Sequence, residues 1–172
     1  MSEVALALIG MGKMGRALAA LAPERGFRVV AELDRAREDY AGISRDTLRG
    51  AQVAIEFTMP DAAPANARAC AAAGCPVVVG TTGWYDQLRV VTASVERYDG
   101  ALLYAPNFSV GVAIFLRAVR AAAEAARSAE FDAHIVEVHH SAKKDAPSGT
   151  ALVVQREAQA GLGRDVPATS VR

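Results

Sequence analysis

The segment 137–152, EVHHSAKKDAPSGTAL, gathers residue types that can carry out chemistry. His139 and His140 can each donate a proton near neutral pH, because free histidine titrates near pH ~6.5. Lys143 and Lys144 follow closely and bring positive charge. We therefore expect a site for an acidic small molecule that is protonated during its reaction. Neighbouring strand residues point to opposite faces, so the two histidines should differ in role unless the chain bends there.

The turn that follows is rich in N–H donors. Pro147 and Gly149 shape it, and Ser148 is predicted to cap a helix. The amides of Ser148, Gly149 and Thr150 would then point outward at the helix start, where a carboxylate binds well. The other interpretation is an ordinary strand end followed by a solvated loop. His134, further back in the strand, is predicted to be structural.

A second pattern, GMGKMG at residues 10–15, fits the G-x-G-x-x-G motif of dinucleotide-binding turns. It lies between a strand-like and a helix-like segment, and Asp34 follows Gly15 by nineteen residues, about the spacing of a ribose-binding carboxylate. The glycines would let the backbone approach a pyrophosphate at a helix N-terminus. A tight turn that binds nothing is the alternative. The predicted contacts from this turn are Gly10, Met11, Gly12, Lys13, Met14 and Gly15.

The choice between NADH and NADPH stays open. Asp34 would accept hydrogen bonds from ribose hydroxyls and repel a 2′-phosphate, whereas Arg35 could attract that phosphate. The pair could equally form a solvated turn. Gly80, Thr81 and Thr82 follow another apolar segment, and their hydroxyl and N–H groups suit the nicotinamide side of a cofactor. The alternative is a loop without a binding role.

The first hundred residues alternate short apolar segments with helical patterns, which predicts an α/β fold of Rossmann type: a parallel sheet with helices on both faces. The expected strands are residues 4–9, 27–33, 51–57, 76–79 and 101–104. The expected helices are residues 13–22, 61–73 with Asp61 as N-cap, and 84–97. Ligands bind at the carboxyl ends of such strands. The residues just beyond those ends are Gly10, Asp34, Thr58, Gly80 and Ala105.

The pattern changes after Pro106, where we place a domain boundary. Residues 1–106 form the predicted dinucleotide-binding domain, and 107–172 a partial α+β substrate-binding domain. The second has expected helices at 110–129 and 148–160, the latter ended by Gly161 and Gly163. Its one expected strand, 131–139, cannot form a sheet alone. Either this strand joins another sheet, or another subunit supplies partners, or the domain is incomplete, which is the prediction.

Composition limits the partners. Nineteen basic and nineteen acidic side chains cancel, and 52% of residues are hydrophobic, which gives no reason to expect binding to nucleic acid or membrane. No basic leader and no apolar span of ~20 residues is seen, so a cytoplasmic protein is expected. Cys70 and Cys75 lack neighbouring ligands and are predicted to be free thiols, with no metal bound.

Five segments in order resemble the 4-hydroxy-tetrahydrodipicolinate reductase (dihydrodipicolinate reductase) family of the diaminopimelate route to lysine. They are the glycine turn 10–15, EFTMP at 56–60, VGTTG at 79–83, APNFSVG at 105–111, and residues 139–152. The resemblance implies an NADH- or NADPH-dependent oxidoreductase that reduces 4-hydroxy-tetrahydrodipicolinate, a small dicarboxylate, to tetrahydrodipicolinate. It also implies a homo-oligomer, a tetramer in the family.

The resemblance also implies residue roles. His139 matches the family's proton donor, Lys143 a catalytic lysine, and His140 a substrate contact. Ser148, Gly149 and Thr150 match the loop that grips a substrate carboxylate. The matching cofactor contacts beyond the glycine turn are Asp34, Arg35, Gly80, Thr81, Thr82, Ala105, Pro106, Asn107 and Phe108.

Two departures leave alternatives. The family's commoner turn has one more residue between its first two glycines. Family chains also continue past Arg172 through strands that complete the sheet and carry a substrate-binding arginine. A dinucleotide-binding or sensor module without catalysis, or an inactive fragment, is therefore the alternative hypothesis. Another small-acid dehydrogenase would not account for residues 143–150.

Overall fold

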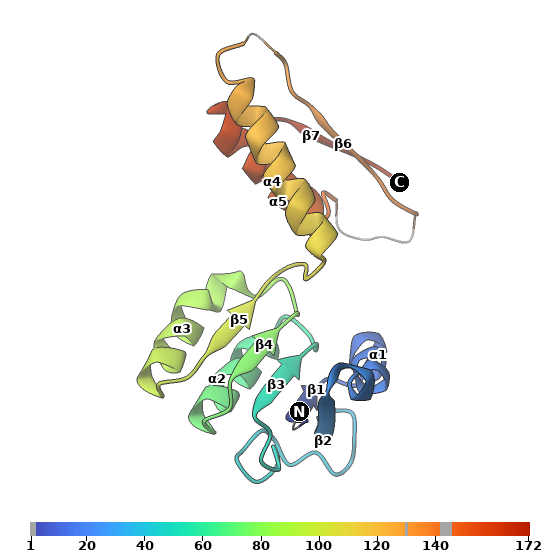
Figure 1. Cartoon of the computed structure of the whole chain (residues 1–172), viewed down its shortest axis with the longest axis vertical. Coiled ribbons are helices and arrows are strands. Elements are labelled where there is room, and N and C mark those ends of the chain that lie inside the picture. The colour runs from blue at the N-terminus through green and yellow to red at the C-terminus, as the bar shows by residue number, and fades with distance from the viewer. Residues whose placement is uncertain (1–2, 130, 142–145) are drawn as a thin grey trace. The chain divides into compact units, whose positions relative to one another are not determined.

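The computed structural model describes residues 3–129, 131–141 and 146–172. The chain divides into two compact units, Met1–Ala105 and Pro106–Arg172, which are described separately (Figure 1). Within the described residues, no helix combines the length and the apolar character needed to cross a membrane.

The first unit is built on a five-stranded parallel sheet with the order β2-β1-β3-β4-β5 (Figure 1). Its strands are β1 (Val4–Ile9), β2 (Phe27–Leu33), β3 (Val53–Glu56), β4 (Val77–Val79) and β5 (Leu102–Tyr104). Its helices are α1 (Lys13–Leu21), α2 (Ala63–Ala72) and α3 (Leu88–Arg97), with short 3₁₀ turns η1 (Pro23–Arg25) and η2 (Tyr85–Gln87). The Rossmann-type order confirms the predicted α/β class.

Successive residues of β1 face opposite sides of this sheet, as the period of a strand requires. Leu6 and Leu8 pack against α1 through a cluster that includes Leu18. Ala7 and Ile9 belong to the larger core, which α2 and α3 complete from the other side. Helices therefore cover both faces, which explains why the central strand β1 is apolar along its whole length instead of alternating.

Two details of the first unit differ from expectation. Asp61 is not an N-cap: α2 begins at Ala63 after Ala62, without a side-chain cap, and Pro64 sits in its first turn, where a missing N–H costs nothing. Trp84 is not helical. It is buried, and its indole N–H donates to the Thr81 carbonyl at 2.8 Å, so the chain turns through η2 before α3 begins.

The two cysteines are free and buried within the first unit. Burial, followed by the nearby Cys75 and Glu56, raises the pKa of the Cys70 thiol to about 12. A thiol held in its protonated form is a poor nucleophile and a poor metal ligand.

The second unit pairs two helices with a two-stranded parallel sheet. The helices are α4 (Val110–Ala125) and α5 (Gly149–Leu162), and the strands are β6 (Ile135–Val138) and β7 (Ala168–Val171). The expectation of a lone strand is therefore wrong. β7 is four residues long and contains Thr169 and Ser170, so its pattern does not stand out from the polar residues around it.

Gly161 does not end the last helix, contrary to expectation. It lies inside α5, and the helix ends at Gly163, which adopts the left-handed conformation with φ 74°. A Cβ on Gly161 would lie 2.4 Å from Ala123 Cβ and 2.8 Å from the Arg120 carbonyl oxygen of α4. Gly161 is therefore a packing residue that allows α4 and α5 to approach closely.

Replacing Gly161 by alanine should lower the free energy of unfolding of the second unit by about 1–3 kcal/mol, because the added methyl group overpacks the helix contact. Urea denaturation followed by circular dichroism measures this change. Gly111→Ala is the matched control within α4, since its Cβ would meet only the Ser109 hydroxyl at 3.6 Å. Equal midpoints for Gly161→Ala and wild type would contradict this account of the packing.

Candidate functional site

The glycine turn joins β1 to α1, and its three glycines have different structural reasons. Gly10 has φ 89°, and a Cβ there would lie 2.2 Å from the Phe57 carbonyl oxygen. A Cβ on Gly15 would lie 2.0 Å from the Gly10 carbonyl oxygen. Gly12 is different, because a Cβ there would meet no atom within 4 Å. Gly10 and Gly15 are thus required by the turn, whereas Gly12 leaves open space beside the start of α1.

This open space is suited to an anion. Gly12 is the N-cap residue of α1 and makes no side-chain cap hydrogen bond. The first N–H groups of a helix have no acceptor within the helix and carry partial positive charge. The turn therefore offers backbone donors and a surface without side-chain obstruction, as a bound pyrophosphate requires.

The carboxyl ends of the central strands are tied together next to this turn. The Phe57 N–H donates to the Ile9 carbonyl at 2.9 Å, and the Gly80 N–H donates to the Glu56 carbonyl at 2.9 Å. The Thr58 N–H donates to the Thr81 hydroxyl at 2.8 Å. A cavity of about 370 Å³ lies at this edge. Its lining residues are Gly12, Lys13, Met14, Phe57, Thr58, Pro60, Gly80, Thr81 and Thr82.

Glu56, the first residue of the EFTMP segment, is a fully buried carboxylate to which sequence reasoning gave no role. Its Oε1 accepts hydrogen bonds from the Asn66 amide at 3.2 Å and from the Thr58 hydroxyl. Glu56 thereby holds the loop after β3 against α2. An acid inside an apolar strand was the available signal for it.

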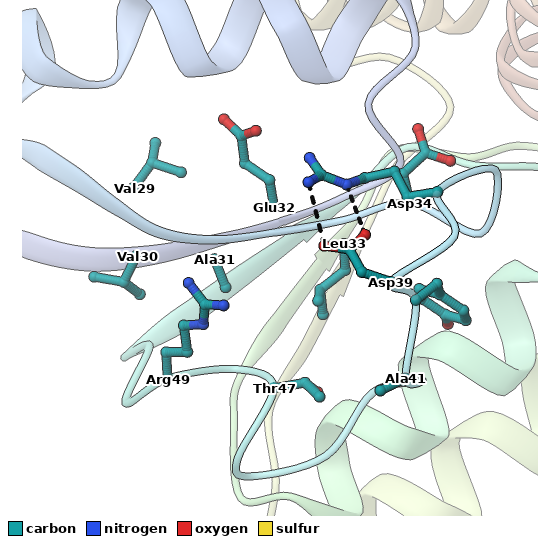
Figure 2. A pocket seen from close by; sticks show the side chains of 12 residues that line it. Val29, Val30, Ala31, Glu32, Leu33, Asp34, Asp39, Ala41, Thr47 and Arg49 are labelled. Carbon is teal, nitrogen blue, oxygen red and sulfur yellow. Dashed lines mark hydrogen bonds and ion pairs between the residues drawn. The ribbon is translucent and has the colours of Figure 1, made fainter.

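Asp34 lies at the end of β2 and contacts the glycine turn directly. Its carboxylate accepts from the Met11 N–H at 3.1 Å and from the Ala36 N–H at 2.9 Å. It also lines a cavity of about 360 Å³ whose side chains come from β2 and the loop that follows, including Glu32, Asp39 and Arg49 (Figure 2). Arg35 is exposed and is not among the lining residues.

The predicted cofactor segment around Pro106 spans the two units. The Ala105 N–H donates to the Val79 carbonyl at 3.4 Å within the first unit. In the second unit, the Asn107 side-chain oxygen accepts from the Ser109 N–H at 2.7 Å, and Phe108 is exposed. Pro106 and Asn107 also line an apolar cavity of about 150 Å³, to which Thr150 at the start of α5 contributes.

The histidine pair follows β6, and the alternation of the strand continues through it. Val138 and His140 are exposed, whereas Glu137 is buried and His139 is half-buried. The His139 N–H donates to the Val171 carbonyl at 3.0 Å, which extends the pairing with β7. His139 and His140 therefore have different surroundings, as expected. His134 contacts the Thr169 hydroxyl across the sheet at 2.7 Å. Lys143 and Lys144 lie outside the described residues.

Ser148 caps α5, as predicted, because its hydroxyl accepts from the Ala151 N–H at 3.1 Å. Its own N–H, however, donates to Glu137 at 3.0 Å and does not point outward as expected. The outward N–H groups therefore begin at Gly149 and Thr150, the first two residues of α5, which have no acceptor within the helix.

Glu137 joins the elements of the second unit and was not singled out from the sequence. Its Oε1 accepts from Ser148, from the Ser170 hydroxyl at 2.7 Å and from Arg172 at 3.2 Å. The hydrogen bond from Ser148, with those from Ser170 and Arg172, lowers the pKa of Glu137 from 4.5 to about 2 against the opposing effect of burial. This carboxylate is therefore ionised at neutral pH.

Glu137→Gln should reduce stability in a pH-dependent way. The folded state binds a proton to Glu137 more weakly than the unfolded state does, so acidification favours unfolding of the wild type. The difference in unfolding free energy between wild type and Glu137→Gln should be full above pH 4.5 and fade as the pH falls toward about 2. Denaturation curves across this range test it, and a difference independent of pH would rule out the ionised carboxylate as its cause.

Family models match both units of the chain. The model described as dihydrodipicolinate reductase, N-terminus, matches residues 4–108. The model described as dihydrodipicolinate reductase, C-terminus, matches residues 111–172.

Individual relatives agree with these matches. A 4-hydroxy-tetrahydrodipicolinate reductase of Thiobacillus denitrificans is 37% identical over 98% of this chain, which spans 70% of that protein. One from an Anaeromyxobacter species is 40% identical over 90% of this chain, which spans 53% of that relative.

Solved structures resemble the fold. A dipicolinate-bound dihydrodipicolinate reductase from Paenisporosarcina sp. TG-14 has a TM-score of 0.75 at 21% identity, covering 98% of this chain and 79% of that one. An inositol dehydrogenase homologue from Azotobacter vinelandii, complexed with NAD⁺, has a TM-score of 0.54 at 15% identity, covering 80% of this chain and 42% of that one. With both units matched in order by the two family models, the chain belongs to the dihydrodipicolinate reductase family.

Proposed function

We propose that this chain binds NADH or NADPH and reduces 4-hydroxy-tetrahydrodipicolinate to tetrahydrodipicolinate. The observation that carries the proposal is the match along both units to relatives of that name, at 37% identity over 98% of the chain. The chain spans 70% and 53% of two such relatives, so a dinucleotide-binding module without catalysis is the alternative.

The cofactor fits the edge of the first unit. The pyrophosphate would bind at Gly12 and the free N–H groups of α1, where no side chain intrudes. Asp34, next to the turn, would accept hydrogen bonds from a ribose. Gly80, Thr81 and Thr82 would line the nicotinamide side of the cavity of about 370 Å³. Arg35 and the segment 105–108 complete the proposed set by resemblance.

The substrate would be held by the second unit. The N–H groups of Gly149 and Thr150 would bind a substrate carboxylate, with Ser148 and its cap fixing the start of the helix. His140, exposed beside this loop in sequence, is the proposed further contact. Lys143 enters the proposal through the resemblance alone, as a cation next to the diacid.

The reaction removes the 4-hydroxyl group of the substrate as water, and the unsaturated ring that remains needs one hydride and one proton. When bound, a reduced nicotinamide supplies the hydride to the unsaturated ring of the substrate. His139 would give its ring proton to the enamine-like product, forming the second new bond to hydrogen, and would regain a proton from solvent. Lys143 would stabilise the charge on the substrate while this happens.

We also propose that the protein works in the cytoplasm as a homo-oligomer. Membership of the dihydrodipicolinate reductase family supports both assignments. The balanced charge of the chain argues against nucleic acid as a partner.

Gly12→Ala tests the cofactor site. We expect it to weaken NADH binding at least about tenfold, equal to about 1.4 kcal/mol, because the methyl group would occupy the place of a phosphate. The thermal midpoint should not change, since the Cβ meets no atom within 4 Å. Isothermal titration with NADH measures the affinity.

Gly15→Ala is the contrasting variant, because its Cβ would lie 2.0 Å from the Gly10 oxygen and should lower both stability and binding. Unchanged NADH affinity in Gly12→Ala would contradict the assignment of Gly12 to the pyrophosphate site.

His139→Ala tests the proton donor. Loss of a general acid costs roughly 10²–10⁴-fold in turnover, and we expect a loss in this range with cofactor affinity unaltered. Substrate-dependent loss of NADH absorbance gives the rate. His134→Ala is the matched control and should keep normal turnover, because His134 contacts Thr169 across the sheet. NADH binding by the wild type without turnover would favour the non-catalytic module.

A further inference from the structure

The Glu137 carboxylate uses its two oxygens differently. Oε1 accepts hydrogen bonds from the Ser148 N–H at 3.0 Å, the Ser170 hydroxyl at 2.7 Å and Arg172 at 3.2 Å. Oε2 accepts no hydrogen bond from the described residues and lies 3.3 Å from Nδ1 of His139. The first oxygen therefore joins β6, β7 and α5, and the second is directed at the proposed proton donor.

The backbone fixes this approach. Glu137 and His139 are two residues apart, so they lie on the same face as the strand continues. The His139 N–H is held by the Val171 carbonyl at 3.0 Å, and Glu137 is held through its three Oε1 contacts. The backbone positions of both residues and the Glu137 carboxylate are therefore fixed by the fold. The fold thus places the carboxylate within reach of the imidazole.

The imidazole is buried on one side only. Its Nδ1 is buried and has no hydrogen-bond partner among the described residues, whereas the whole side chain keeps 35% of its surface exposed. The exposed surface therefore belongs to the rest of the ring, and Nδ1 is turned toward the protein interior. A buried nitrogen beside a buried carboxylate oxygen leaves the outer edge of the ring for a ligand.

Charge decides which nitrogen carries the proton in the neutral ring. Glu137 is ionised at neutral pH because the hydrogen bonds from Ser148, Ser170 and Arg172 lower its pKa to about 2. A carboxylate attracts an N–H and repels a nitrogen lone pair, so Oε2 stabilises the form with the proton on Nδ1.

We infer that Glu137 is a positioning residue for the proton transfer, which orients the His139 ring and directs its transferable proton to Nε2. In the step, the Nε2–H bond of the imidazolium breaks as the new bond to the substrate forms, and the neutral ring keeps its proton on Nδ1. The Oε1 contacts tie the same carboxylate to the loop that would hold the substrate. This inference rests on the proposed function for its consequence in turnover.

Imidazole ¹H–¹⁵N correlation spectra test the inference without requiring turnover. The chain has three histidines, so His134→Ala and His140→Ala assign the His139 signals. At alkaline pH the wild type should carry the His139 proton on Nδ1. Glu137→Gln should move it to Nε2, because the glutamine carbonyl oxygen would keep the Oε1 contacts and the amide N–H groups, which donate, would then face Nδ1. A wild-type spectrum with the proton on Nε2 overturns the inference, even if Glu137→Gln does not fold.

Kinetics separate positioning from a purely structural role. Glu137→Gln should lower kcat by roughly 10–100-fold, the range for a residue that orients a catalytic group, with the NADH dissociation constant and the substrate KM nearly unchanged. Ser170→Ala is the matched control. It removes an Oε1 contact and should lower stability, while the His139 tautomer and kcat stay as in wild type.

Two results would count against Glu137 in particular. A wild-type kcat in folded Glu137→Gln overturns the inference. An equal fall of kcat in Ser170→Ala and Glu137→Gln also overturns it, because it would indicate that Glu137 only joins the structural elements around it. Absent turnover in the wild type instead contradicts the proposed function, and the spectra then decide the Glu137–His139 pairing independently.

Discussion

The parallel pairing of the strands is the constraint on which the first unit depends. The strands of a parallel sheet all have their carboxyl ends at the same edge. The loops after β1, β2, β3 and β4 therefore lie along one edge although they are far apart in the sequence. Hydrogen bonds then lock neighbouring loops, such as the one from the Thr58 N–H to the Thr81 hydroxyl. The glycine turn and the cavity of about 370 Å³ therefore lie at the same edge of the sheet.

The second unit is organised around a buried charge. Glu137 is 8% exposed and would be costly to bury alone, but three donors surround its Oε1. A small unit with two strands has little apolar core, so such a junction contributes order where packing is limited. It also makes β6, β7 and the start of α5 interdependent, and the proposed substrate loop therefore depends on residues at the end of the chain.

Local pattern was sufficient for most elements. β1 and β2 have the predicted bounds, because a continuous apolar segment marks β1 and the apolar and β-branched residues of FRVVAEL mark β2 between polar turns. Helix ends were less predictable: Asp61 has the right type for a cap, but Ala62 takes that position. Gly161 resembled a helix end, yet contact with α4 selects a small residue there. For Gly161, the packing of a neighbouring helix outweighed the local preference.

The sequence by itself determined the glycine turn, the acid at the end of β2, the histidine pair and the capping serine, because each depends on spacing within one strand, turn or helix. Only the tertiary structure decided the pairing of β6 with β7, the open space beside the Gly12 Cα, and the convergence of Ser148, Ser170 and Arg172 on Glu137. These features join segments distant in sequence. Spacing along a chain carries no information about which oxygen of a carboxylate will face which donor.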